Sequence, residues 1–466
     1  KDTVRNNFVK GGRNVLYNQR ADFTYNLPTA KFPLLDWTTA SLTYKTTYSW
    51  IGASRLAISL GNTIQNSNAK AATVALDFNR LYSKFRILRA IDQRGAPGFT
   101  QLPKGIPVLP GDPRAKTDTT KNKNQKPKRD PNKLPELNGF TKTLGKILTS
   151  LKQVTFNYSD GATTFLPGYT DSTKFLGQNW NSMAPGLDFI FGRQPDSIWL
   201  NRAAGVGLVT RDTLQNNLFR QTYDQQFNAN AQMEPFRDLH IDLNLTKTFS
   251  KTYSELFRDT SLGNGKFGHL NPYAGGGFSV SYISFQTLFR KFNPNTISET
   301  FKQFQNNREI LSARLGKLNP YSQVVGSDGY YQGYGRYAQD VLIPAFIAAY
   351  TNKDPNSVSL LKTGGPTVKS NPFSGYLPKP NWRISYSGLT AIPSLQKLFT
   401  SFTLNHAYNS TLSMNSFNSA LLFQDRFALG YPSFIDTISN NFIPYFLVPN
   451  ITIQEQFNPL LGIDFS

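Results

Sequence analysis

The chain has 466 residues and a formal net charge of +21, with 39% hydrophobic residues, 14% aromatic residues and no cysteine. The lack of cysteine excludes disulfide frameworks, cysteine–zinc sites and thiol catalysis. Part of the positive charge lies in a Pro/Lys-rich stretch at 103–135, which has almost no aromatic residues on which bases could stack. We expect this stretch to be a solvated, disordered loop, and we expect no nucleic-acid partner.

Residues 1–78 are predicted to be strands joined by tight turns. Apolar side chains recur at every second position within 41–50, 56–60 and 74–78, which places them on one face of an extended chain. The polar run Asn66-Ser67-Asn68 separates the last two segments and predicts the turn of a hairpin. The chain begins with Lys1 and without a signal-peptide pattern, so we expect a processed product or a fragment.

Residues 79–150 break the strand pattern and predict a helical insertion that contains the Pro/Lys-rich loop. Apolar residues recur at helical spacing on both sides of that loop. The first set is Leu81, Phe85, Leu88 and Ile91, and the second is Phe140, Leu144, Ile147, Leu148 and Leu151. The basic residues on the other faces suit a membrane-surface helix, but packing of the two helices on each other is the simpler prediction.

Residues 151–295 are predicted to return to strands, with a long irregular insertion rich in Gly, Pro and aromatic residues at 166–200. The clearest hairpin of the chain follows. Apolar and polar residues alternate over 223–233 and again over 239–249, and a short turn at 234–238 joins the two runs. A short turn between two long alternating strands is typical of the periplasmic end of a membrane barrel.

Residues 296–352 predict a second helical insertion. Thr296-Ile297-Ser298-Glu299 matches a capping box, and a helical run over 341–350 contains Pro344, which predicts a short or kinked helix. Residues 353–466 are then predicted to be strands again. Alternation is clear at 382–386, 402–415 and 451–457, and it keeps its phase through Leu461, Ile463 and Phe465.

These strands allow either a soluble β-sandwich or part of a membrane barrel. Neither needs the run of about 18 apolar residues that a membrane helix requires, and the sequence has none. The polar faces are rich in Asn, Gln, Ser and Thr rather than in charges, which favours the wall of a hydrated lumen over the outer face of a sandwich. We therefore predict an all-β fold that is part of a very large transmembrane antiparallel β-barrel with short helical extramembrane insertions.

The sequence offers little that could carry catalysis. Residues 263–268 match G-x-G-x-x-G, but a glycine-rich run and another strand follow, whereas a dinucleotide site needs a helix. None of His240, His269 and His406 has metal-ligand spacing, and we expect His406 to lie at an interface or against protein. Glu299 and Glu309 fit solvation or capping in the helical insertion. We predict no enzyme and no catalytic, cofactor-binding or metal-binding residues.

Several segments, in this order over most of the chain, resemble the SprA/Sov family, the giant outer-membrane translocon of the type IX secretion system of Bacteroidota. They comprise residues 191–196, 199–200, 208–212, 237–257, 298–301, 307–308, 339–346, 381–389, 406–408 and 451–464. These are structural stretches and not a catalytic signature. Proteins of that family are several times longer, so the resemblance implies that this chain corresponds to a C-terminal part.

The resemblance implies a function in protein secretion and a link to gliding motility. Family members form a very wide pore in the bacterial cell outer membrane and export folded cargo proteins. Their partners are outer-membrane lipid, the secreted cargo, a lipid-linked barrel shuttle of the PorV type, a periplasmic plug protein and, here, the rest of the same translocon chain. On this interpretation residues 166–200 shape the pore or meet a partner, although they also fit a packed loop.

Two other classes fit parts of the pattern. Another outer-membrane barrel, either a TonB-dependent transporter or a lipopolysaccharide-insertion barrel, would explain the strands. The first should show an N-terminal plug domain, which this sequence does not show. The second usually relies on disulfides, which a sequence without cysteine cannot form. A soluble β-rich surface adhesin is the third class. It would stay folded in plain buffer, whereas a piece of a barrel needs lipid or its neighbouring strands.

Overall fold

The computed structural model describes residues 5, 14–92, 139–285, 288–289, 293–361 and 367–466. The predicted disordered loop at 103–135 lies outside the described residues. Strand makes up 40% of the structure and helix 20%, so the fold is mostly β. The structure confirms the prediction of long antiparallel strands with helical insertions between them.

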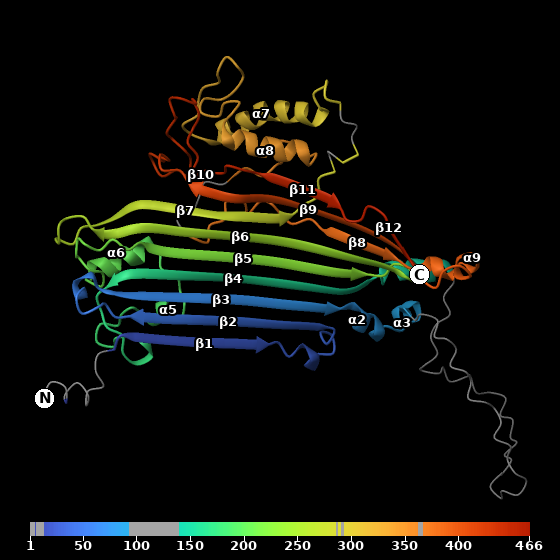
Figure 1. The fold of residues 1–466 in the computed structure, drawn as a ribbon, viewed down its shortest axis with the longest axis horizontal. Helices are drawn as coiled ribbons and strands as arrows, with labels where there is room; N and C mark the ends of the chain where they lie inside the picture. The colour runs from blue at the N-terminus through green and yellow to red at the C-terminus, as the bar shows by residue number, and fades with distance from the viewer. Residues whose placement is uncertain (1–4, 6–13, 93–138, 286–287, 290–292, 362–366) are drawn as a thin grey trace, which may run out of the picture.

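The described strands form one antiparallel sheet in which neighbours in sequence are mostly neighbours in space (Figure 1). They are β1 (Leu16–Asn26), β2 (Thr38–Ile51), β3 (Asn62–Asp77), β4 (Leu151–Tyr169), β5 (Phe219–Met233), β6 (Leu239–Asp259), β7 (Phe267–Ser281), β8 (Asn381–Tyr386), β9 (Phe402–Ser419), β10 (Phe446–Leu447), β11 (Thr452–Phe457) and β12 (Gly462–Phe465). Strands β1–β7 follow one another as antiparallel neighbours. In this register the apolar side chains of one strand lie beside those of the next, on the same face of the sheet.

Two positions of the sheet are shared by interrupted strands. Strand β7 pairs with one half of β6 and β9, and β8 pairs with the other half of the same two strands. The chain leaves the sheet after Ser281 and returns at Lys379, whose N–H donates to the Ser281 carbonyl at 2.9 Å. Strands β10, β11 and β12 likewise follow one another along β9. The sheet therefore has nine strand positions.

Helices occupy the connections. They are α2 (Phe78–Lys84), α3 (Arg86–Asp92), α4 (Gly139–Leu148), α5 (Leu187–Ile190), α6 (Ser197–Gly205), α7 (Glu299–Leu318), α8 (Gln339–Tyr350) and α9 (Pro393–Gln396), with short 3₁₀ turns η1 (Thr29–Lys31), η2 (Ile58–Leu60), η3 (Phe175–Gly177) and η4 (Gly388–Ala391). We call the end of the sheet at which β3 passes into α2 the α2 end, and the opposite end the α6 end. No helix in the described ranges is long and apolar enough to cross a membrane.

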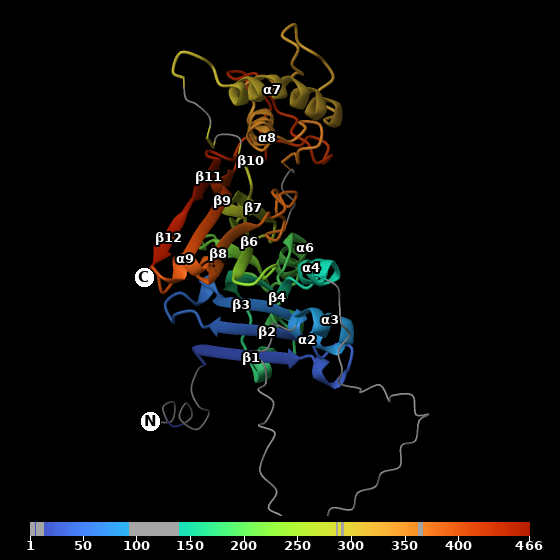
Figure 2. The ribbon, with the colours of Figure 1, turned by 90° about the vertical axis from the view of Figure 1, so that its right-hand side faces the viewer.

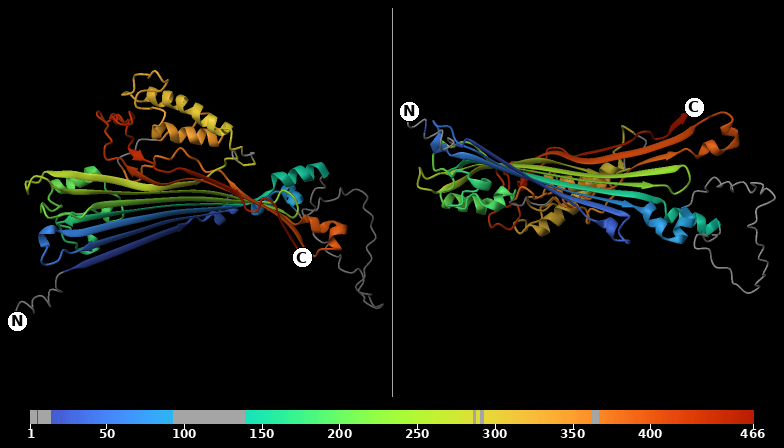
Figure 3. Two further views of the ribbon diagram at one scale, coloured as in Figure 1. Left: turned by 45° about the horizontal axis from the view of Figure 1, so that its top comes forward. Right: turned by 90° about the horizontal axis from the view of Figure 1, so that it is seen from below.

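The sheet is open, and no closed barrel is formed within the described residues. Strand β1 lies at one edge and β10–β12 lie at the other, and they do not pair with each other. The sheet twists strongly, so that β1–β3 and β9–β12 point in clearly different directions in Figure 2. Figure 3 shows the same twist, with α5, α6, α7 and α8 all on one side of the sheet.

Several local predictions were wrong. The described residues of 353–380 form no strand, Leu151 begins β4 and does not end a helix, and the first helical run is two helices, α2 and α3. Asn66-Ser67-Asn68 is not a turn but the middle of β3, and the hairpin turn lies earlier, at 52–61. The Asn66 and Asn68 side chains are buried there, because they bind the backbone of a distant segment. The second helical insertion begins two residues later than predicted, since Ser298 rather than Thr296 caps α7 by accepting from the Phe301 N–H.

Candidate functional site: the two faces of the sheet

One face of the sheet is lined by short neutral polar side chains, and we call it the polar face. On β5 it presents Thr222, Gln226, Asn228, Asn230 and Gln232, which pair in register with Thr252, Thr248, Thr246, Asn244 and Asp242 of β6. Most of these side chains are exposed. The predicted amide-rich and hydroxyl-rich face is confirmed.

The polar face is hollowed at mid-height. A depression of about 700 Å³ crosses strands β2–β9 and is lined on this face mainly by small side chains such as Ala69, Ala71, Gly161 and Gly277. Small residues at these points let the sheet bend without its own side chains filling the hollow. The polar face therefore has a concave region that is open to water.

The opposite face has an uncovered half towards the α2 end, and its rows of apolar side chains form what we call the apolar band. These are Phe23, Tyr25, Ala40, Leu42, Ala72, Val74, Leu76, Val154, Phe156, Tyr158, Phe227, Ala229, Ala231, Met233, Leu239, Ile241, Leu243, Leu245, Trp382, Ile384, Tyr386, Phe402, Leu404, Ile463 and Phe465. Several are strongly exposed, with Phe23 at 57% and Phe465 at 62%. Contiguous exposed apolar surface marks a membrane or protein contact.

The band has a defined inner edge. Along three of these strands, the next side chain on the same face towards the α6 end is charged. These side chains are Lys70 on β3, Asp160 on β4 and Lys247 on β6. The β6 row from Leu239 to Leu245 spans six steps of about 3.3 Å, or about 20 Å along the strand. Outer-membrane barrels have an apolar height of about 25 Å, so this row is shorter than that height.

The inner edge of the band runs obliquely across the sheet. The last band residue is Leu42 on β2, but the residue of β6 that lies across the sheet from Leu42 is already Lys247. On β9 the residue across from Leu42 is Leu412, and the last band residue is Leu404. The edge therefore shifts by eight residues, or about 26 Å, over roughly 29 Å of sheet, which corresponds to an angle of about 42°. Barrel strands are tilted from the membrane normal by about 35–45°.

The other half of this face is covered by the segment 170–218, which contains α5 and α6. Asn66 Nδ2 donates to the carbonyls of Phe189 at 2.7 Å and Arg193 at 2.8 Å, and Gln221 Nε2 donates to the Pro195 carbonyl at 2.7 Å. Tyr48 and Phe189 pack edge to face. Buried amides of the sheet thus satisfy carbonyls of the insertion, as buried polar groups require.

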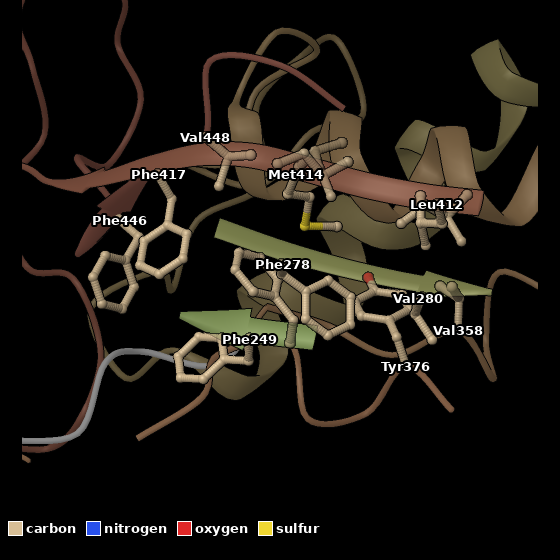
Figure 4. Close-up of a cluster of buried hydrophobic side chains, with 14 of the residues drawn as sticks. Phe249, Phe278, Val280, Val358, Tyr376, Leu412, Met414, Phe417, Phe446 and Val448 are labelled. Carbon is tan, nitrogen blue, oxygen red and sulfur yellow. The ribbon is translucent and has the colours of Figure 1, made fainter. Parts of the chain in front are cut away.

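A second insertion, residues 282–380, covers the same face over β6, β7 and β9. Figure 4 shows its Val358 and Tyr376 packed with Phe249, Phe278 and Met414 of the sheet. Two lysines of β6 hold it in place through backbone carbonyls: Lys247 Nζ lies 3.4 Å from the Ser374 oxygen, and Lys251 Nζ lies 3.1 Å from the Thr367 oxygen. Lys251 is 3% exposed and also lies over the Phe446 ring.

The location of the insertion was not predicted. The irregular stretch proposed at 166–200 begins instead at residue 170, because β4 continues to Tyr169, and it contains α5 and α6. It packs on the apolar side of the sheet and not against the amide-lined face. A signal was present in the sequence, since Asn66, Asn68 and Gln221 interrupt otherwise apolar rows at the positions where the insertion binds.

The three histidines lie apart from one another. His240 Nδ1 is 3.1 Å from Glu234 Oε1, and His269 Nδ1 is 2.9 Å from Glu255 Oε2. Each therefore has a carboxylate beside it that sequence spacing did not reveal. His406 Nδ1 donates to the Leu460 carbonyl at 2.6 Å, which confirms that it lies against protein. In the part of the chain that the structure describes, no group of three or more potential ligands could hold a metal.

One carboxyl in the insertion has a shifted pKa. Loss of hydration raises the pKa of Asp340, in the first turn of α8, to about 6, and a hydrogen bond with the Gln339 side chain partly opposes this rise. Asp340 borders a cavity of about 30 Å³ lined by Leu361, Phe373 and Phe446. Asp340 is half-buried, and the cavity beside it is too small for a substrate-sized molecule.

Glu299 and Glu309 are both in α7, as predicted. Glu299 pairs with Lys302 at 2.8 Å, and Glu309 lies beside Gly329. The glycine-rich match at 263–268 falls in the turn between β6 and β7, so its predicted place between strands is confirmed. Scans of protein-family models and of curated protein sequences find no match to this chain.

Proposed function

We propose that this chain is part of the wall of a wide outer-membrane β-barrel that conducts folded proteins, as the resemblance to the SprA/Sov translocon implies. One observation carries the proposal: the uncovered half of one sheet face is an apolar band, and the face behind it is polar, with many Asn, Gln, Ser and Thr side chains and a few charged ones such as Asp242 and Arg383. In a barrel wall, the first would contact lipid and the second would line water. The proposal includes no catalytic role.

The charge pattern supports lipid contact. A charged side chain facing the middle of the bilayer costs about 2–4 kcal/mol in such barrels, so the lipid face should be free of charge over the membrane thickness. The band contains no charged side chain, and Lys70, Asp160 and Lys247 begin where it ends. A sandwich would instead bury these rows under a second sheet, and the described strands belong to one sheet only.

The open edges support a larger barrel. If nine strand positions closed on themselves, neighbours 4.8 Å apart and tilted by about 40° would give a diameter of roughly 18 Å. A folded domain of about 100 residues has a radius of gyration of about 13 Å, so it would need a barrel of roughly 25 strands or more. The unpaired edges of β1 and β10–β12 are where further strands would join.

The polar face suits a passage for proteins. Neutral Asn, Gln, Ser and Thr side chains keep a passing surface hydrated, but they bind it less strongly than charged groups would. In this proposal the two insertions lie on the outer side of the wall, beyond the membrane. There they are placed to contact a partner such as a PorV-type barrel, and not to narrow the pore.

Site-specific photo-crosslinking tests the proposal during export. A photoreactive amino acid at Asn244 on the polar face of β6 should capture secreted proteins in transit, and the same residue at neighbouring Leu243 should capture lipid. The two positions share the strand, the depth and the local backbone, so each is the control for the other. Capture of cargo from Leu243, or from neither position while export proceeds, would contradict the proposal.

A further inference from the structure

We propose that helices α2, α3 and α4 form a foot that lies in the headgroup layer of the membrane leaflet at the α2 end of the sheet. This inference rests on the proposed function and adds to it the depth of the chain in the bilayer and a lipid-binding surface. In Figures 2 and 3 the three helices stand beyond the end of the strands, on the same side of the sheet as α5 and α6.

The foot exposes apolar side chains that its own packing leaves uncovered. Leu144, Ile147 and Leu148 share one face of α4, at spacings of three and four residues, and are 49%, 47% and 72% exposed. Phe85 and Ile87 nearby are 53% and 59% exposed. An amphipathic helix with its apolar side outward is unusual in water and typical of a helix that lies in a membrane interface.

The helices nevertheless pack on one another, as predicted. Ile91 of α3 is 6% exposed and lies against Gly145 of α4, where an added methyl group would clash with it. Tyr82 of α2 is also buried, and Phe78 packs between Tyr82 and Trp37. The exposed residues are therefore on the outside of a folded unit, and no other described residue covers them.

The foot is continuous with the apolar band. On β3 the band residues Val74 and Leu76 lead directly into α2 at Phe78, and α4 ends three residues before β4 begins at Leu151. The short β5–β6 turn lies at the same end of the sheet, as expected of the periplasmic end of a barrel. The lipid layer that covers the band would therefore contact the foot at the membrane surface.

The charge of the foot suits lipid phosphate. The three helices contain six Lys or Arg residues and one Asp. Arg80 and Arg86 are exposed, although Arg80 Nε lies 4.0 Å from Asp36 Oδ2, and Lys84 is bound by Asp36 and the Pro33 carbonyl. Interfacial helices bind anionic membranes with this arrangement: their apolar side chains enter the acyl boundary, and basic side chains lie beside them.

Quenching by spin-labelled lipids tests the foot. Because the 466 residues contain no cysteine, single variants Leu148→Cys, Leu243→Cys and Leu56→Cys can each carry an environment-sensitive fluorophore in this part of the protein. The whole protein is placed in phosphatidylethanolamine–phosphatidylglycerol vesicles with a nitroxide near the headgroup or deep in the acyl chain. Leu56 is a fully exposed leucine at the α6 end and serves as the matched control.

We expect the label at 148 to lose more emission to the shallow nitroxide, the label at 243 to lose more to the deep one, and the label at 56 to respond only to aqueous iodide. If 243 responds to lipid but 148 responds only to iodide, or to no quencher because protein covers it, the foot is overturned and the proposed function stands. If 243 also fails to respond to lipid, both are overturned.

Discussion

The two halves of the apolar sheet face are formed by the same alternating strands. The insertions cover the half towards the α6 end and leave most of the half towards the α2 end uncovered. Towards the α6 end the rows mix aromatic residues with Asn, Gln and Lys, and Asn66, Gln221 and Lys251 donate to carbonyls of the insertions. Towards the α2 end the rows are uncharged, and the described residues cover them only in part, through Phe285 on Trp382 and Phe399 on Phe402 and Phe465. Polar residues in an apolar row therefore mark where protein packs on this sheet, and their absence marks where we propose that lipid does.

The largest effect should separate a protein-covered aromatic from a lipid-facing one. Phe249→Ala removes a ring that is 2% exposed between Tyr223 and Phe417, and should cost about 3–5 kcal/mol of unfolding free energy in any solvent. Phe227→Ala, on the neighbouring strand, should cost less than half as much in lipid, because lipid chains can fill the space. Equal losses in denaturant unfolding from vesicles would show that both halves face protein.

A charge in the band should be the next most harmful change. Leu243→Arg should lower the unfolding free energy in lipid by about 2–4 kcal/mol, since the guanidinium would face the hydrocarbon. Asn244→Arg, one residue along on the polar face, should have little effect because its side chain reaches water. The amount of each variant assembled in the membrane gives an independent measure, and equal assembly of the two would contradict the proposed orientation.

The covered half should depend on its buried amides. Asn66→Ala leaves the carbonyls of Phe189 and Arg193 without their donor and should cost about 1–3 kcal/mol. Limited proteolysis should then cut the 170–218 insertion first, while the sheet stays intact. Gln65→Ala, the neighbour whose exposed side chain is on the polar face, is the control and should leave the insertion protected.

The smallest expected effect concerns pH and the second insertion. The pKa of Asp340 is raised to about 6 in the folded protein, above its usual value of about 3.9, so folding favours the protonated carboxyl. The contribution of Asp340 to the unfolding free energy should be greatest below pH 4, fall as pH rises to about 6, and stay lower above that, by on the order of 1–2 kcal/mol. Asp340→Asn should remove this dependence from the denaturant midpoints, and an unchanged pH profile would show that Asp340 keeps its water.

Local patterns were sufficient to predict much of the sheet. The β5–β6 hairpin and its turn at 234–238 agree with the structure, because both strands and the turn are contiguous in the sequence. The helices of the first insertion and the strands at 381–386 and 402–419 were predicted for the same reason. Each depends on periodicity within one segment and not on a distant partner.

The features that the sequence could not predict depend on contacts between residues far apart in the chain. Asn66 resembles a turn residue until its partners Phe189 and Arg193, more than 120 positions away, are known. The replacement of β7 by β8 beside β6, with residues 282–380 inserted between them, depends on register across the sheet. The side on which the insertions pack was missed for the same reason, although buried amides within apolar rows were a usable signal.

The central claim is that adjacent residues of β6 face lipid and water. Spin labels at Leu243→Cys and Asn244→Cys, in the whole protein in vesicles, measure this directly through collisions with oxygen, which concentrates in hydrocarbon, and with a water-soluble nickel chelate. The account predicts that oxygen dominates at 243 and the nickel chelate dominates at 244. Dominance of the nickel chelate at both positions, or protection from both reagents at 243, would contradict it.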